Sequence, residues 1–351
     1  MPIARAPGRV TLIGDHTDYN QGLSLPMAID LATTATFTPK PDSFLVGIES
    51  DQVLEPYEIP LAGLAQGHAV PGSAAVAPPH TLLAAGLISL AGPTSGGTLT
   101  VTSTVPVGAG LSSSAAFSVA LLLALGQTLN PVEMAVLCQK AEAMAGAHVG
   151  LLDPLAIMGA QEGHALSIDF ATLRTRQVPV PPHAAFVIVH SGASRELGTS
   201  EYGARRAECE RAANQIGRPL GLCDLSDLSS VTDPVLRRRA RHVVTECTRV
   251  RQAEHLLGRG NLAAVGALMT EGHRSLAGDY KVSTSTVDEL VDHLIRTPGV
   301  LGARMTGGGF GGCVIALCEP DSPALDPAQH APLRCWQVSP SRGAELLARS
   351  Q

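Results

Sequence analysis

The stretch 106–129 constrains the fold most, because a glycine turn runs directly into a segment with apolar residues on nearly every side. Gly108 and Gly110 precede three consecutive serines, and a run of Ala, Val and Leu follows them. A helix of this composition has to be buried inside a domain, and it is too short and too interrupted to cross a bilayer. The chain therefore folds around this helix, with the glycine turn at the helix start.

The glycine turn also predicts an anion-binding site. The first amides of a helix have no partner within the helix and lie at the positive end of its dipole, while glycines let a ligand approach the main chain. The serine hydroxyls add donors and candidate magnesium ligands. The turn is not a Walker loop, since it lacks the Gly-Lys-Ser/Thr sequence. An ordinary serine-capped helix is the alternative, and these residues alone leave both interpretations open.

The length of the chain predicts two domains with a cleft, because 351 residues exceed the size at which a single core stops growing. The Pro-rich segment 178–182 is the best candidate linker, which divides the chain into residues 1–180 and 181–351. Hydrophobic residues make up 45% of the chain and charged residues 16%, so a disordered or fibrous protein is excluded.

The charge pattern argues against nucleic-acid binding. The net charge is −6, and no long basic run is present. The short arginine cluster at 237–241 is interpreted as a solvated helix face. The seven cysteines form no paired CxxC spacing, and no apolar run reaches the ~18 residues that a membrane span needs. We expect a cytoplasmic protein, neither exported nor anchored, without a disulfide scaffold or structural zinc, and acting as a monomer.

The hydrophobic pattern predicts a mostly antiparallel sheet in the first half and a helix-rich second half. The first half is expected to contain a loop at 66–80, helices at 112–129 and 131–144, and strands at 9–14, 33–37, 44–49, 98–104 and 165–169. The second half is expected to contain strands at 186–190, 302–305 and 313–318 and helices at 200–217, 234–257, 262–275 and 285–297.

Polar residues gather where the first strand ends. Asp15, His16 and Asp18 follow the strand, and Arg9 lies one strand-length upstream. They could be metal ligands, catalytic groups or partners for a polyol, but two carboxylates and one histidine are too few to identify a metal site. Carboxylates accept hydroxyl protons well, and a site built in this way rejects analogues that lack a hydroxyl. A turn cluster without a ligand is the alternative.

Two further carboxylates are candidates for chemistry. Asp153 lies among apolar residues directly before a proline, and a guanidinium such as that of Arg9 would keep it ionised and able to accept a proton. Glu142, eleven residues earlier on a predicted helix, is a candidate magnesium ligand. A turn aspartate and a solvated glutamate are the alternative interpretations.

A second glycine cluster lies at 307–312. Gly307, Gly309 and Gly312 match the spacing of the dinucleotide-binding fingerprint, but a strand follows them where that fingerprint needs a helix. The cluster instead predicts a close approach of the backbone to a ligand or to the other domain. A flexible hairpin is the alternative.

Together these motifs resemble the galactokinases of the GHMP kinase superfamily. Residues 9–22 are similar to the galactokinase signature, 106–116 to the phosphate loop of the superfamily, and 304–313 to its third motif. Residues 200–202, 239–244 and 272–283 also resemble galactokinases, so the likeness covers nearly the whole chain. Four departures stand out: Asp15 replaces a usual Glu, Pro154 replaces a usual Gln, the Trp-x-x-Tyr stretch before the phosphate loop is missing, and the interval from Glu142 to Asp153 is one residue short.

The resemblance implies an α+β fold with a ribosomal-S5-like N-terminal lobe, a ferredoxin-like C-terminal lobe, and a sugar and MgATP in the cleft between them. It implies phosphorylation of the anomeric hydroxyl of galactose by ATP, with Asp153 receiving or orienting the hydroxyl proton and Arg9 holding Asp153 ionised. The implied sugar contacts are Asp15, His16, Asp18, Gly150, Asp153 and Tyr202. The implied triphosphate contacts are Gly108, Ala109, Gly110, Leu111, Ser112, Ser113 and Ser114, and Ser114 with Glu142 would hold Mg²⁺.

Three alternatives accompany this hypothesis. The first is a related sugar 1-kinase acting on galactosamine, N-acetylgalactosamine or arabinose, which the change at Asp15 keeps open. The second is a regulator that binds galactose and ATP without catalysis, which the presence of Ser114 and Asp153 disfavours. The third is a nucleotide-binding oxidoreductase, supported only by the formal glycine match at 307–312.

Overall fold

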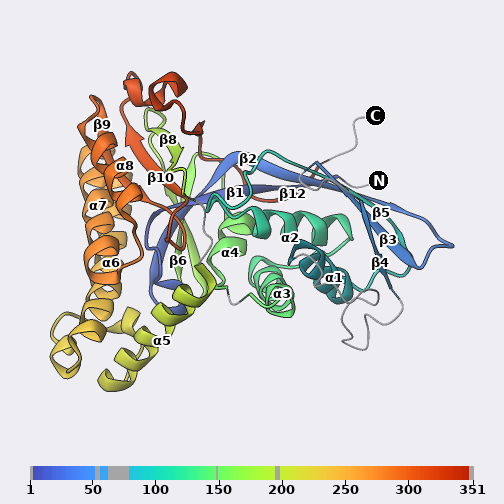
Figure 1. The fold of residues 1–351 in the computed structure, drawn as a ribbon, viewed down its shortest axis with the longest axis horizontal. Coiled ribbons are helices and arrows are strands. Elements are labelled where there is room, and N and C mark those ends of the chain that lie inside the picture. The colour runs from blue at the N-terminus through green and yellow to red at the C-terminus, as the bar shows by residue number, and fades with distance from the viewer. Residues whose placement is uncertain (1–2, 52–55, 62–78, 148, 194–197, 348–351) are drawn as a thin grey trace.

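The computed structural model describes residues 3–51, 56–61, 79–147, 149–193 and 198–347. Within these residues the strands form an eight-stranded and a four-stranded sheet. In Figure 1 most of the first sheet, with β1 to β5, lies on the right, and the second sheet, with β8 to β10, lies on the left beside the helices of the later part of the chain. The mixed helix and strand content agrees with the predicted α+β class.

The first sheet has the order β12-β1-β2-β5-β3-β4, and β6 pairs with both β2 and β7. All its pairings are antiparallel except that of β3 with β5. The second part of β1 is buried on both faces, because α2 and α4 pack on it as well as α6 and α7 from the later part of the chain. The strands are β1 (Ile3–Ile13), β2 (Leu23–Pro39), β3 (Leu45–Ser50), β4 (Tyr57–Pro60), β5 (Gly97–Ser103), β6 (His164–Asp169), β7 (Arg174–Pro179) and β12 (Glu345–Leu347).

Four helices lie on one side of the first sheet, as Figure 1 shows: α1 (Pro79–Ala91), α2 (Ser113–Ala124), α3 (Pro131–Met144) and α4 (Leu152–Gly159). Helix α2 is buried along most of its length, as its apolar composition predicts. Helix α3 begins where the sequence indicates, because Asn130 and Glu133 form a capping box around Pro131 at the first helical position. These helices place the glycine turn, Glu142 and Asp153 at one end of the layer.

The second sheet has the antiparallel order β11-β8-β10-β9. Its strands are β8 (Ala185–His190), β9 (Val300–Met305), β10 (Cys313–Cys318) and β11 (Cys335–Val338), and the helices of this half are α5 (Gly198–Ile216), α6 (Pro234–Gly258), α7 (Leu262–Ser275) and α8 (Ser285–Arg296). Helix α8 buries a single apolar stripe of Val287, Leu290, Val291 and Leu294, the spacing expected of a helix on a sheet. The largest hydrophobic cluster fills the first half and continues onto one face of the second sheet, a second cluster lies within the second half, and a small third cluster lies around α4 and β6.

Some expectations need correction. The predicted linker at 178–182 begins inside β7, where Val178 pairs with Ala165. Of the predicted loop at 66–80, residues 66–78 lie outside the described residues, and 79–80 begin α1, which the sequence did not predict. The division at residue 180 stays a prediction, and β12, late in the chain, pairs with β1. In the part of the chain that the structure describes, no helix is long and apolar enough to cross a membrane.

Candidate active site

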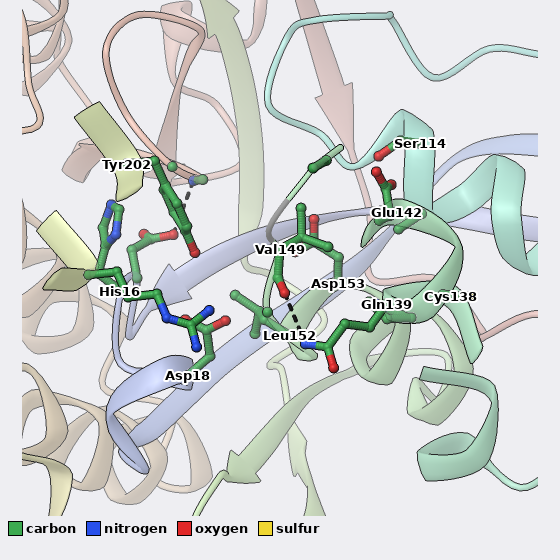
Figure 2. Close-up of a pocket in the computed structure, with 18 of the residues that line it drawn as sticks. His16, Asp18, Ser114, Cys138, Gln139, Glu142, Val149, Leu152, Asp153 and Tyr202 are labelled. Carbon is green, nitrogen blue, oxygen red and sulfur yellow. Dashed lines mark hydrogen bonds between the residues drawn. The ribbon is translucent and has the colours of Figure 1, made fainter. Parts of the chain in front are cut away.

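A cleft of about 400 Å³ is lined by residues from both halves of the chain (Figure 2). This volume falls in the range of sites for small molecules. Most of the predicted site residues line it together: Arg9, Asp15, His16, Asp18, Ser114, Glu142, Gly150, Asp153 and Tyr202. Of the predicted phosphate loop, Ser114 is among the residues that line the cleft, whereas Gly108, Ala109, Gly110, Leu111, Ser112 and Ser113 are not among them. Figure 2 places Ser114 and Glu142 at one end and His16 and Tyr202 at the other.

Arg9 and Asp153 form an ion pair at the centre of the site. Arg9 Nε and Nη2 lie 2.7 and 2.6 Å from Asp153 Oδ1, and Arg9 also donates through Nη1 to the carbonyl of Gly110 at 2.8 Å. Arg9 is buried on β1, whereas the Asp153 side chain, in the first turn of α4, keeps 31% of its surface exposed. An exposed, paired carboxylate facing a cleft is available to a ligand.

The glycine turn has the backbone that its residues predict. Gly108 and Gly110 have φ angles of 74° and 83°, which glycine adopts without steric cost. Ser112 precedes α2 with a φ of 64°, an unusual conformation for a residue with a side chain. Its hydroxyl makes no capping bond and instead donates to Asp153 Oδ2 at 2.5 Å. The turn, the helix start and the carboxylate are thus one connected unit.

Ser114 and Glu142 provide two neighbouring oxygen ligands at the end of the cleft opposite His16 and Tyr202 (Figure 2). Burial raises the pKa of Glu142, and the hydrogen bond from the Ser114 hydroxyl opposes that rise. Hydroxyl and carboxylate oxygens are hard ligands of the kind that Mg²⁺ takes together with phosphate oxygens. In the described part of the chain, no group of three or more His, Cys, Asp or Glu residues could hold a metal alone. A cation here would share its coordination with a ligand.

Asp15 is held by two donors from the third glycine motif. Its Oδ2 lies 2.9 Å from Arg304 Nη2, and its Oδ1 accepts from the Gly307 amide at 3.1 Å. Burial raises the pKa of Asp15 to about 6, against the lowering effect of the Arg304 charge. Arg304 in turn pairs with Glu246 of α6 at 2.8 Å. The end of β1, the glycine motif and α6 therefore meet at one buried charge cluster.

Asp18 lines the cleft beside Gly150. Burial raises the pKa of Asp18 to about 6, and repulsion from Asp153 adds to the rise. A side chain at Gly150 would collide with Asp18, since an added β-carbon would lie 1.6 Å from Oδ2. The glycine is thus required for Asp18 to occupy its position.

Aromatic and histidine side chains cover the end of the cleft near α5. His16 has a positive φ of 65°, and its Nδ1 lies 2.9 Å from the hydroxyl of Tyr19, which lies 2.7 Å from that of Tyr280. The Tyr202 ring lies 5.5 Å from the His16 ring between centroids. Burial raises the pKa of Tyr202 well above 10, so its hydroxyl keeps its proton.

Several residues of the site are not identified by the reasoning from sequence. Glu246 and Gln139 belong to no motif identified in the sequence, and the sequence assigns no role to Arg304, although Arg304 begins the 304–313 motif. Gln139 donates to the Val149 carbonyl at 2.9 Å, next to Gly150, as Figure 2 shows. Arg206 of α5 also lines the cleft and lies 6.0 Å from the Tyr19 ring. Their roles depend on packing that no local pattern contains.

Family models and solved structures define the class. The model of the GHMP kinase N-terminal domain matches residues 81–160, and that of the GHMP kinase C-terminal region matches 253–328. A mevalonate kinase structure shares the fold with a TM-score of 0.67 at 18% identity, covering 96% of this chain and 98% of that chain. The fold is that of a GHMP kinase.

More specific matches identify the branch of that class. The galactokinase galactose-binding signature matches residues 2–39. The human galactokinase is 43% identical over 90% of this chain and 83% of its own length, and a Mycobacterium bovis galactokinase is 40% identical over 90% and 88%. The structure of Lactococcus lactis galactokinase complexed with galactose has a TM-score of 0.87 at 29% identity, covering 99% of this chain and 95% of that chain. The chain belongs to the galactokinase family.

Proposed function

We propose that this chain transfers the γ-phosphoryl group of ATP to the anomeric hydroxyl of D-galactose, giving α-D-galactose 1-phosphate and ADP. The activity is that of the galactokinase family to which the chain belongs. The observation that carries the proposal is the Arg9–Asp153 ion pair, which faces a cleft with a polar, aromatic end and an oxygen-rich end. Phosphoryl transfer depends mainly on positioning and charge stabilisation, which such a pair can provide.

The sugar binds at the end lined by Asp15, His16, Asp18, Gly150 and Tyr202. Asp18 accepts hydrogen bonds from sugar hydroxyls, and His16 and Tyr202 provide an imidazole and a protonated phenol for the others. Each carboxylate oxygen of Asp15 already accepts one hydrogen bond, from Arg304 or from the Gly307 amide. Each oxygen keeps a second lone pair, which can accept a hydrogen bond from a sugar hydroxyl. Analogues that leave these buried groups without partners bind poorly.

The nucleotide binds at the turn formed by Gly108 to Ser114. The amides at the start of α2, together with the helix dipole, attract the triphosphate. Ser114 and Glu142 would hold Mg²⁺, and the chemistry that the ion would supply is positive charge close to the phosphate oxygens. Ser112 contributes its backbone to this site, since its hydroxyl is bonded to Asp153.

Asp153 accepts the proton of the anomeric hydroxyl, and Arg9 orients the carboxylate through the ion pair. The hydroxyl oxygen then attacks the γ-phosphorus directly, so no phosphorylated enzyme forms. Every group that the proposed reaction needs comes from a single chain, so the reaction requires no residue from a second subunit. The seven cysteines are free thiols, which is compatible with a reducing cytoplasm.

Asp153→Asn tests the assignment, because the amide keeps the shape of the side chain but cannot accept the proton. We expect turnover to be lost while galactose binding, measured by calorimetry without nucleotide, remains detectable. The matched control is Asp169→Asn, which removes a carboxylate at the end of β6 that does not line the cleft. Full turnover by Asp153→Asn would remove Asp153 from its proposed role.

A related sugar 1-kinase is the second candidate, favoured by the short Asp15 side chain that Arg304 and Gly307 hold in place. Turnover of galactose, galactosamine, N-acetylgalactosamine and arabinose with MgATP separates the candidates. We expect the highest kcat/KM for galactose. A higher kcat/KM for another sugar would make that sugar the preferred substrate, and the proposed reaction, phosphorylation of an anomeric hydroxyl, would stay the same.

A further inference from the structure

The hydrogen bonds of Asp153 use three of the positions at which its carboxylate can accept. Oδ1 receives two donors, Arg9 Nε at 2.7 Å and Arg9 Nη2 at 2.6 Å. Oδ2 receives one donor, the Ser112 hydroxyl at 2.5 Å. The last distance is that of a short, charge-assisted bond between a hydroxyl and a carboxylate.

This arrangement identifies the oxygen that is left for chemistry. An ionised carboxylate has about four lone-pair positions, two on each oxygen. Both positions on Oδ1 are occupied by Arg9, so the remaining position lies on Oδ2, beside the Ser112 hydroxyl. Asp153 keeps 31% of its side chain exposed, which leaves this position accessible from the cleft.

The backbone of Ser112 explains how its hydroxyl reaches the carboxylate. At the position before α2, a serine usually caps the helix through its side chain, but Ser112 makes no such bond. Its φ of 64° lies in the left-handed region, which is costly for a residue other than glycine. The neighbouring turn is fixed by Arg9, whose backbone amide donates to the Leu111 carbonyl at 3.1 Å and whose Nη1 donates to Gly110.

We propose that Ser112 is a positioning residue, whose hydroxyl orients the Asp153 carboxylate so that Oδ2 accepts the proton of the anomeric hydroxyl. The inference rests on the proposed function. In the step, the sugar O–H bond breaks and its proton passes to Oδ2. The electron pair left on the sugar oxygen forms the new bond to the γ-phosphorus, while the bond from that phosphorus to the departing ADP oxygen breaks.

A serine hydroxyl of the phosphate loop can have one of two roles: it can bind the nucleotide, or it can orient Asp153. A nucleotide ligand strengthens ATP binding, whereas a positioning group for Asp153 affects the chemical step after both substrates are bound. It also couples the conformation of the loop to the orientation of the base, because Ser112 belongs to both. A loop that shifts away from α4 takes the Ser112 hydroxyl away from Oδ2.

The test uses Ser112→Gly and Ser112→Ala. Glycine removes the hydroxyl and tolerates the positive φ, whereas alanine removes the hydroxyl and keeps the strain. We expect kcat at saturating substrates to fall about 100-fold in both variants, the cost of a misplaced reacting group. The Kd of a non-hydrolysable ATP analogue, measured without sugar, should be unchanged. Thermal unfolding confirms that each variant is folded.

Ser118→Ala is the matched control, since Ser118 lies in α2, which Ser112 directly precedes, and its hydroxyl donates to the Ser114 carbonyl. We expect this variant to keep the kcat of the unaltered protein. The proposal is overturned if Ser112→Gly keeps full kcat, or if its only defect is weaker nucleotide binding. Asp153→Asn distinguishes a failure of the proposed function from a failure of the role proposed for Ser112. If Asp153→Asn keeps its activity, Asp153 is not the base. If Asp153→Asn is inactive and Ser112→Gly is fully active, only the role of Ser112 is contradicted.

Discussion

The carboxylate of Asp18 packs against the backbone of Gly150, so closely that a β-carbon on Gly150 would lie 1.6 Å from Asp18 Oδ2. Asp18 follows the first strand of the chain, and Gly150 directly precedes the turn into α4. The position of a carboxylate in the cleft is therefore set by the absence of a side chain on a different element. Gln139 supports the same turn through its bond to the Val149 carbonyl.

Gly150→Ala is expected to weaken galactose binding, because the methyl group displaces Asp18 from its position. Loss of a hydrogen bond to a charged group costs about 1.5–3 kcal/mol, so KM for galactose should rise about 10–100-fold. Steady-state kinetics with saturating MgATP measures the change. Gly203→Ala is the control, since Gly203 lines the same cleft with open space around it. Equal effects of the two substitutions would contradict the close-packing argument.

The pH dependence of galactose use should reflect Asp15 and Asp18, whose pKa values are both raised to about 6. Below that pH the two carboxylates are protonated in the free enzyme and lose acceptor positions for sugar hydroxyls. We expect kcat/KM for galactose to fall as the pH drops from 7 to 5. Asp18→Asn should have a lower value at pH 7 and a shallower decline. A profile that Asp18→Asn leaves unaltered would argue against Asp18 as a titrating sugar contact.

Unfolding should not explain that decline. The pKa values of Asp15 and Asp18 lie above the usual 3.8, so the folded chain binds more protons than the unfolded chain between about pH 4 and 6. Their contribution to stability therefore increases as the pH falls through this window. The pKa of Glu246 is held low by Arg304 and Arg249 against the cost of its burial, so its contribution is fully present above pH 4.5. Melting temperatures across the same pH range provide the check.

Arg304→Met should be strongly destabilising. Arg304 is fully buried between Asp15 and Glu246, and its removal leaves two buried carboxylates without their main partner. Breaking a buried pair in this way costs about 3–5 kcal/mol in the free energy of unfolding, measured by urea denaturation. The matched control is Arg342→Met, whose exposed pair with Glu162 should contribute nothing measurable. A loss of stability as small as that of the control would mean that the cluster of Asp15, Arg304 and Glu246 does not stabilise the fold.

Glu142→Gln should raise the Mg²⁺ concentration needed for half-maximal activity. The amide removes a negative oxygen ligand beside Ser114, and the expected increase is at least about 10-fold. The Kd for galactose without nucleotide should stay the same, because Glu142 lies at the opposite end of the cleft (Figure 2). Glu133→Gln on the same helix is the control, since a glutamine can maintain the capping box. An unchanged Mg²⁺ requirement would exclude Glu142 as a ligand.

Short-range signals in the sequence located many of the elements. Helix α3 begins where Asn130 and Pro131 predict, because capping depends on residues within one turn of each other. Helix α1 and the early part of β2 (Leu23–Pro39) escaped prediction, since neither has a strong periodic pattern, and β2 is defined by its partners β1, β5 and β6. Long strands depend on pairing as much as on their own residues.

By itself the sequence determined the family, the buried α2 helix and many of the residues that line the cleft, because these depend on motifs of neighbouring residues. Only the tertiary structure decided how those residues are connected. Arg9 meets Asp153 across 144 positions, and Asp15 meets Arg304 across 289. It also turned the Ser112 hydroxyl away from the helix start and toward Asp153. Contacts over such separations are set by how sheets and helices pack, and no local pattern of residue types encodes that packing.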